Sequence, residues 1–363
     1  MTPAMPNSPF KTCIIVTGAA GFVASHLVEA LLDQADETQL IIGVDNFLTG
    51  RQGNLDEVAR HPKADSQFGF LQADVTVPAE TYLTPLFNEL IVAGRLANDY
   101  SVQAIYHLAS PASPPRYQDH PVETYQVNAF ATHELLSYLK KNHPKSSFIF
   151  ASTSEVYGDP EVHPQPETYW GMVNPNGVRS CYDEAKRLGE SICGVFERDF
   201  GLDVRIMRIF NTYGPRMDPD DGRVIPNFIK QAIQGDKLTI YGSGGQTRSY
   251  CYVSDLVDGI VRLGAETDAN GQPLKGATIN LGNPDEYSIQ ETAEVIYEAV
   301  HSQPLTSEML EFRELPGDDP TRRKPDITRA QETLGWQPSV SLIDGLRKTV
   351  SYFIETEGIH KGE

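Results

Sequence analysis

The stretch that decides the fold is TGAAGFVASHL, residues 17–27. It follows the apolar run KTCIIVTG and precedes a segment with the apolar spacing of a helix. Its G-x-x-G-x-x-A spacing (Gly18, Gly21, Ala24) permits a tight turn after a strand and close packing of the next helix. Free N–H groups at the start of that helix favour an anion. Glycine is common in such turns, so the trio alone is a weak signal for a dinucleotide pyrophosphate.

Outward from this unit, the chain alternates between strand-like and helix-like segments. Helices are expected at 20–34, 121–142 and 180–200, and residues 80–101 are expected to form a helix and a loop. Strands are expected at 11–18, 39–46, 68–75, 102–110, 146–153 and 203–211. This alternation predicts an α/β fold of the Rossmann type, with a doubly wound parallel sheet and helices on both faces.

After about residue 211, Pro and Gly interrupt the pattern, which predicts a smaller C-terminal α/β domain. We expect a dinucleotide-binding domain over residues 11–210 and a mainly substrate-binding domain over residues 211–360. Segments at about 245–270 are expected to return to the first domain.

Composition excludes several classes of function. The 363 residues carry a formal net charge of -19, which argues against binding nucleic acid. An anionic small molecule remains possible if arginines gather in a cleft. Four cysteines without a CxxC pair, together with no signal peptide and no apolar run of about 18 residues, indicate a cytoplasmic protein that has no membrane partner. No HExxH or Cys–His spacing predicts a metal site.

The second expected strand ends at Asp45, about 20 residues after the glycine-rich turn. An acid there accepts hydrogen bonds from the adenosine ribose and repels a 2′-phosphate, so NAD is favoured over NADP. Ligands of open α/β sheets lie at the carboxyl ends of the strands. By this rule Asp74 and residues 108–110 are expected to line the same crevice. The full set of expected NAD-binding residues is Gly18, Gly21, Phe22, Val23, Asp45, Asn46, Phe47, Thr49, Gly50, Asp74, Val75, Leu108, Ala109, Ser110, Tyr182, Lys186, Thr212 and Arg223.

The stretch CYDEAKR places Tyr182 and Lys186 four residues apart, on one face of a helix. With 16 tyrosines in the chain, a surface pair formed by chance is the alternative. Behind a dinucleotide turn, the pair indicates a phenol base. Its ordinary pKa of about 10 would be lowered by about 1–3 units by the ammonium, and further by oxidised nicotinamide. Tyr182 would then take a proton from a sugar hydroxyl, while Thr153 binds the reacting oxygen.

The stretch TSEVYG, residues 153–158, puts the carboxylate Glu155 at the end of a buried strand. Glu155 could cap the next helix or pair with a surface base. The functional alternative is proton handling next to a ketone, or electrostatic control of a carboxylate. Arg216, Arg223, Arg248 and Arg323 supply guanidinium groups that suit diphosphate and carboxylate oxygens, although each alone could be solvated. The glycine-rich YGSGGQTRS, residues 241–249, lacks the ending of a phosphate loop and would otherwise be an exposed hairpin.

Taken together, these residues resemble the extended short-chain dehydrogenase/reductase family that acts on nucleotide sugars, from about residue 11 to residue 354. TGxxGFxxSHL, the strand end VDN, YxxxK and LGWQP carry that resemblance. Within the family, the chain is most similar to the decarboxylases of UDP-glucuronate. The stretches that carry this finer resemblance are HLASPASPPRY, ASTSEVYGDPEVHPQ, YWGMVNP, RIFNTYGPRM, DGRVIPNFI, YGSGGQTRS, YVSDLV and RRKPDI.

The resemblance implies a reaction and a set of roles. Oxidation at C4 of UDP-glucuronate by NAD, loss of CO₂ and return of the hydride would give UDP-xylose with NAD regenerated. The helices at about 120–142 and 180–200 would pair in a homodimer. The implied catalytic residues are Thr153, Glu155, Tyr182, Lys186 and Arg323, the last beside the substrate carboxylate. The implied substrate-binding residues are Pro111, Ser154, Asn211, Val224, Asn227, Tyr241, Arg248 and Arg323.

Several alternatives stay open on the same scaffold. A dehydratase of this family carries Asp where Ser154 stands, which argues against loss of water. A UDP-sugar 4-epimerase has no need of Glu155. An oxidative decarboxylase that releases a UDP-4-keto-pentose and NADH shares the Glu155 and Arg323 positions and is the main alternative. A non-catalytic NAD-sensing module is the alternative from another class.

Overall fold

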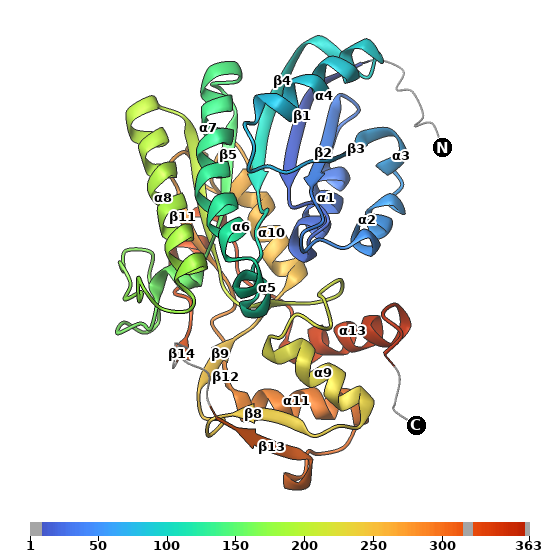
Figure 1. Cartoon of the computed structure of the whole chain (residues 1–363), viewed down its shortest axis with the longest axis vertical. Helices are drawn as coiled ribbons and strands as arrows, with labels where there is room; N and C mark the ends of the chain where they lie inside the picture. The colour runs from blue at the N-terminus through green and yellow to red at the C-terminus, as the bar shows by residue number, and fades with distance from the viewer. Residues whose placement is uncertain (1–8, 315–321, 360–363) are drawn as a thin grey trace.

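The fold is built on a seven-stranded sheet in the order β11-β6-β5-β4-β1-β2-β3, with every pair parallel (Figure 1). The structure, a computed structural model, describes residues 9–314 and 322–359; positions 315–321 and 360 of the predicted second domain lie outside that part. The strands of this sheet are β1 (Phe10–Thr17), β2 (Gln39–Asp45), β3 (Phe68–Gln72), β4 (Leu96–His107), β5 (Ser147–Thr153), β6 (Asp203–Ile209) and β11 (Thr278–Leu281).

Helices cover both faces of the sheet because successive strand residues point to opposite sides. In β1, Ile14 and Val16 belong to one hydrophobic cluster, and Cys13 and Ile15 belong to the other. The first cluster includes side chains of α1 (Phe22–Gln34), α2 (Gln52–Ala59) and α10 (Val253–Gly264). The second includes side chains of α4 (Glu80–Val92), α7 (Ala131–Asn142) and α8 (Ser180–Phe200). The predicted α/β Rossmann-type class is confirmed.

The strand order reverses between β1 and β4, which both lie in the middle of the sheet. The chain leaves β1 toward one side through α1 and enters β4 on the other side, so the loops after these strands diverge. In open α/β sheets this divergence creates a crevice at the carboxyl ends of the strands. The loops after residues 17 and 107 therefore face a shared crevice.

Two segments differ from the sequence expectation. The expected loop before residue 102 is instead strand, because β4 begins at Leu96, opposite Phe10, with register shifts along its pairing with β1. The polar stretch ANDYS hid this strand, since it lacks apolar alternation. The single helix expected over residues 121–142 is interrupted: between α6 (Pro121–Tyr125) and α7, residues Gln126–Phe130 form a turn of π-helix. Such turns are frequent near functional sites.

A smaller lobe lies below the carboxyl ends of the sheet (Figure 1). Its strands form three small sheets, β10-β7, β12-β9-β14 and β13-β8. The strand β11 (Thr278–Leu281) also belongs to the large sheet. The sequence predicted a return to the first domain only at about residues 245–270. The remaining elements are α3 (Ala64–Gln67), α5 (Pro114–Asp119), the 3₁₀ turns Ser154–Tyr157 and Ser307–Met309, β7 (Thr212–Tyr213), α9 (Val224–Gln234), β8 (Leu238–Tyr241), β9 (Thr247–Ser249), β10 (Cys251–Tyr252), β12 (Glu286–Ser288), α11 (Ile289–His301), β13 (Leu310–Arg313), β14 (Arg322–Arg323), α12 (Thr328–Leu334) and α13 (Leu342–Glu355).

Candidate active site

The glycine-rich turn is held at the carboxyl ends of three strands. Gly18 has a φ of +76°, and its N–H donates to Val44 O at 2.7 Å. A Cβ on Gly18 would lie only 2.7 Å from the backbone nitrogen of Ala109, so the turn and the end of β4 touch. The N–H of Gly21 donates to Gly18 O at 2.8 Å, and α1 begins at the next residue. A backbone cradle without side chains at a helix start fits the pyrophosphate of a dinucleotide.

Asp45 fixes the other side of this cradle. Its Oδ2 accepts the N–H of Ala20 at 3.0 Å, and its Oδ1 accepts the N–H of Phe47 at 2.7 Å. Burial raises the pKa of Asp45, while these hydrogen bonds oppose the rise. A carboxylate oxygen has more than one acceptor position, so both oxygens keep the capacity to bind ribose hydroxyls. A Cβ on Gly50 would lie only 2.8 Å from Asp45 Oδ1, so only glycine fits beside this carboxylate without displacing it.

One cavity of about 690 Å³ runs from this cradle into the smaller lobe. Most of the predicted site residues line it: Gly18, Gly21, Phe22, Val23, Leu108, Ser110, Thr153, Ser154, Glu155, Tyr182, Lys186, Asn211, Thr212, Arg223, Val224, Asn227, Tyr241, Arg248 and Arg323. The predicted residues that do not line it are Asp45, Asn46, Phe47, Thr49, Gly50, Asp74, Val75, Ala109 and Pro111. Among these, Asp74 accepts the N–H and hydroxyl of Thr76 at 2.9 and 2.8 Å and so closes a local turn.

Tyr182 and Lys186 lie on the cavity face of α8, with the Lys186 Nζ 5.7 Å from the centre of the Tyr182 ring. The Thr153 side chain is near enough to the phenol to lower its pKa. Burial nevertheless raises the pKa of Tyr182, and nearby carboxylates add to the rise. Lys186 donates to Ala151 O at 2.6 Å, and burial lowers its pKa to about 7. The predicted lowering of the phenol pKa by Lys186 is therefore wrong for the protein's own groups, because desolvation outweighs the nearby cations.

Glu155 pairs with two arginines from different elements. Arg179 Nη2 donates to its Oε2 at 2.6 Å, and Arg323 Nη1 lies 3.2 Å from its Oε1. Burial raises the pKa of Glu155, but the charges of Arg323, Arg179 and Arg248 outweigh it, so the pKa lies below its ordinary value. The backbone N–H of Glu155 donates to Thr153 Oγ1 at 3.2 Å. The carboxylate is thus ionised, and it lines the same cavity as Tyr182 and Lys186.

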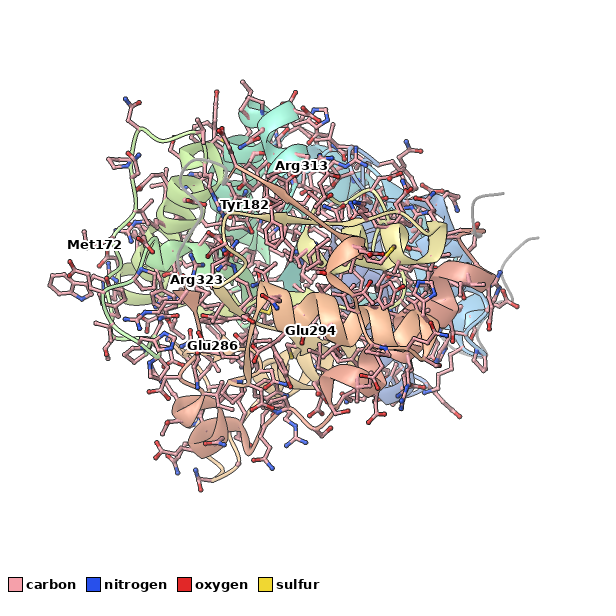
Figure 2. All side chains as sticks on the ribbon, turned by 90° about the horizontal axis from the view of Figure 1, so that it is seen from below. Met172, Tyr182, Glu286, Glu294, Arg313 and Arg323 are labelled. Carbon is pink, nitrogen blue, oxygen red and sulfur yellow. The ribbon has the colours of Figure 1, made fainter. Side chains whose placement is uncertain are left out.

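The cavity is basic although the chain is strongly acidic. Arginines gather there from both lobes, as binding of an anionic small molecule requires. Figure 2 shows Tyr182 and Arg323 in the interior of the molecule, while Met172 projects at its edge. Arg216 is not part of this group, because it pairs with Glu29 at 2.6 Å. The lining arginines are Arg179, Arg223, Arg248, Arg313 and Arg323.

Sequence reasoning missed three residues near the reacting groups. Tyr117 stacks on Tyr182, with ring centres 5.0 Å apart and planes at 8°, and its buried hydroxyl has no hydrogen-bond partner. Arg179 lies one helical turn before Tyr182, a spacing that could have signalled a shared face. Burial raises the pKa of Asp183 to about 7, and the nearby Glu155 adds to the rise. Nothing in the local sequence marks Tyr117, since α5 reaches Tyr182 only through tertiary packing.

The alternative of an exposed hairpin at residues 241–249 is excluded by the strand pairing. The strand before this loop, β8, pairs with β13, whereas the strand after it, β9, pairs with β12 and β14. The loop therefore joins two small sheets, and Tyr241 and Arg248 at its ends line the cavity. Over residues 9–314 and 322–359, no helix is long and apolar enough to cross a membrane. Within the same ranges, no group of three His, Cys, Asp or Glu side chains is arranged to hold a metal ion.

Comparison with known proteins defines the class. The sequence profile of the NAD dependent epimerase/dehydratase family matches residues 14–282, and the chain belongs to this family. The resemblance to this family noted from the sequence is confirmed.

The particular relatives narrow the comparison. The chain is 44% identical over 370 residues to UDP-glucuronic acid decarboxylase 5 of Arabidopsis thaliana. This alignment covers 99% of this chain and 97% of that protein. It is 46% identical over 340 residues to UDP-glucuronic acid decarboxylase 1 of Xenopus tropicalis. This alignment covers 94% of this chain and 72% of that protein. Among solved structures, the UDP-glucuronic acid 4-epimerase of Bacillus cereus in complex with UDP-glucuronic acid and NAD superposes with a TM-score of 0.77. The two chains are 29% identical, and the superposition covers 94% of this chain and 99% of that chain.

Proposed function

We propose that the protein decarboxylates UDP-glucuronate to UDP-xylose and CO₂ through a UDP-4-keto intermediate, with NAD regenerated in each turnover. The observation that carries this function is the ionised Glu155 held between Arg179 and Arg323, in the same cavity as Tyr182. The named relatives at 44–46% identity are UDP-glucuronic acid decarboxylases, which agrees with it.

NAD is the cofactor, and the backbone around Gly18 and Gly21 fits its pyrophosphate. The Asp45 carboxylate, raised in pKa by burial, would hold the adenosine ribose. When bound, NAD would supply the hydride acceptor for C4 and the hydride that is returned. Its oxidised ring would add a positive charge beside the phenol, whose pKa burial raises in the protein alone.

Tyr182 would take the proton from the C4 hydroxyl, and Thr153, which lines the same cavity, would hold the same oxygen. Once C4 is a ketone, the C6 carboxylate is β to a carbonyl. Cleavage of the C5–C6 bond releases CO₂ and leaves the electron pair in an enolate delocalised onto the C4 oxygen. Protonation at C5 gives the UDP-4-keto-pentose. Return of the hydride to C4, with a proton from Tyr182 to the C4 oxygen, would then give UDP-xylose.

Glu155 and Ser154 favour loss of CO₂ over loss of water. Arg323 Nη1 donates to Ser154 Oγ at 3.0 Å, so position 154 supplies a neutral acceptor for this arginine. A serine cannot act as the acid that expels a hydroxyl at neutral pH. A UDP-sugar 4-epimerase is the second candidate, because the Bacillus cereus structure, which superposes over 94% of the chain, is named as one that binds UDP-glucuronic acid.

One experiment separates the candidates. Purified protein with NAD is incubated with UDP-glucuronate, and the nucleotide sugars are followed by NMR while NADH absorbance is recorded. We expect UDP-xylose without net NADH. A UDP-4-keto-pentose with stoichiometric NADH identifies the oxidative decarboxylase, and UDP-galacturonate identifies the epimerase. Unchanged substrate rejects all three.

The homodimer and the cytoplasmic location are also proposals. On the helices α6 to α8, exposed apolar side chains include Tyr125, Phe130, Leu188 and Phe200. A hollow of about 540 Å³ between α7 and α8 is lined in part by Ile192, Val195 and Phe196. An apolar helical face of this kind supports pairing of the two helices with those of a second copy. The four free cysteines support a reducing compartment.

A further inference from the structure

The segment that follows Asp45 is bonded directly to the glycine-rich turn. The N–H of Ala20 donates to Asp45 Oδ2 at 3.0 Å, and Ala20 O accepts the N–H of Arg51 at 2.9 Å. The buried Asn54 adds a second hydrogen bond to the same carbonyl, from its Nδ2 at 2.9 Å. A displacement at the start of α2 is therefore passed on to the backbone cradle that fits the cofactor.

The Arg51 side chain meets the C-terminal part of the chain. Its Nη1 and Nη2 donate to Glu357 Oε1 and Oε2 at 2.8 and 2.5 Å, across 306 positions in the sequence. Glu357 follows α13 by two residues, and α13 packs against α9 and α11 of the smaller lobe (Figure 1). The two parallel hydrogen bonds thus join the cofactor cradle to the smaller lobe, in the geometry that makes an arginine–carboxylate pair strong and specific.

A second ion pair between the lobes has a different character. Arg216 Nη2 lies 2.6 Å from Glu29 Oε1 of α1, and the Arg216 side chain is 9% exposed, compared with 35% for Arg51. Parting of the Arg216 pair would leave a buried charge without a partner, which is costly. The Arg51–Glu357 pair can instead separate into water, so it suits a contact that opens and closes.

The outcome of the proposed reaction depends on how long the reduced cofactor stays in its site. UDP-xylose forms only if NADH remains bound between the oxidation at C4 and the return of the hydride. Release of NADH before that return would leave a UDP-4-keto-pentose as the product. A contact that slows opening of the cofactor cradle therefore favours UDP-xylose.

We propose that the Arg51–Glu357 ion pair holds the smaller lobe against the cofactor cradle and thereby keeps NADH bound until the hydride returns. This inference rests on the proposed function. Arg51 and Glu357 are positioning residues, because they act on the cofactor through the hydrogen bonds of Ala20 and Asp45 and do not touch the reacting atoms.

The test measures release of NADH in the absence of substrate. Protein loaded with NADH is mixed with excess NAD by stopped flow, and the loss of bound-NADH fluorescence gives the dissociation rate. Glu357→Gln is expected to raise this rate about fivefold, the upper end for a partly exposed ion pair. Rising salt should speed release from the wild type and leave the variant nearly unchanged, because ions screen the pair. A merely structural role would not produce this difference in salt dependence.

Two further variants separate the ion pair from other effects. Arg51→Glu combined with Glu357→Arg restores opposite charges and is expected to return the rate to within about twofold of the wild type. Glu80→Gln is the matched control, because it breaks the 2.6 Å ion pair between Glu80 of α4 and Lys141 of α7, neither of which lines the cavity. It should release NADH at the wild-type rate.

During conversion of UDP-glucuronate, Glu357→Gln should release more UDP-4-keto-pentose and NADH than the wild type. A wild-type NADH release rate in Glu357→Gln, an equal rise in Glu80→Gln, or a reversed pair that releases NADH as fast as Glu357→Gln overturns the inference. If Glu357→Gln does not fold, Arg51→Gln decides by the same rate. Because release is measured without substrate, wild-type protein that binds NADH but does not convert UDP-glucuronate rejects the proposed function and leaves this test valid.

Discussion

Gly18→Ala tests whether the contact between the glycine-rich turn and the end of β4 shapes the cofactor site. Two costs add at this position. An alanine at a φ of +76° is strained by about 1–2 kcal/mol. Its Cβ would also lie 2.7 Å from Ala109 N and 2.8 Å from Ala109 Cα, well inside the ~3.5 Å of normal packing. Since both neighbours are backbone atoms, the strand end or the turn must move, at a cost of about 1–3 kcal/mol.

Two other glycines separate these costs. Gly201 has a φ of +72° with no atom within 4 Å of an added Cβ, so Gly201→Ala measures the backbone strain alone. Gly53, within α2, also has open space and a helical backbone, so Gly53→Ala should be neutral or stabilising by up to about 1 kcal/mol. We expect losses in free energy of unfolding of about 1–2 kcal/mol for Gly201→Ala and about 2–5 kcal/mol for Gly18→Ala.

The assay combines urea unfolding with NAD titration of each variant. NAD affinity should fall at least about tenfold in Gly18→Ala, because the displaced backbone forms the pyrophosphate cradle, and should stay unchanged in the other two. If Gly18→Ala loses no more stability than Gly201→Ala and binds NAD like the wild type, the contact with Ala109 does not shape the site.

Three further variants test the site and the helical face that carries Phe200. Tyr182→Phe should abolish turnover while NAD affinity stays within about twofold; retained turnover, followed by NMR, refutes the assigned base. Glu155→Gln should slow conversion after the first oxidation, so the UDP-4-keto intermediate should build up. Because the pKa of Glu155 lies below the ordinary 4.5, its ionised form stabilises the fold above that pH, and this contribution is lost as pH falls through the folded pKa. The urea midpoints of wild type and Glu155→Gln should therefore converge as the pH falls below about 4.5, and a constant gap contradicts the ion pairs. Phe200→Glu on α8 should shift the mass in solution from dimer to monomer, measured by light scattering, and an unchanged mass argues against this face as the interface.

Much of the fold could be predicted from the sequence because the signals were local. The buried strands are short apolar runs, and the G-x-x-G-x-x-A turn marks where the first strand passes into a helix. The beginning of β4 was missed because residues 97–101 lack the apolar alternation of a strand, although this segment pairs with the start of β1. The interruption of the helix at Gln126–Phe130 leaves no mark in the apolar spacing.

The sequence by itself determined the parallel α/β architecture, the cofactor turn and the Tyr182–Lys186 pair, because each depends on residues close together in the chain. Only the tertiary structure decided the charge state and surroundings of the site. Arg323 meets Glu155 from 168 residues further along the chain, and Tyr117 reaches Tyr182 by packing of α5 against α8. Ion pairing and desolvation depend on distance in space, so the low pKa of Glu155 and the raised pKa of Tyr182 follow from the folded arrangement.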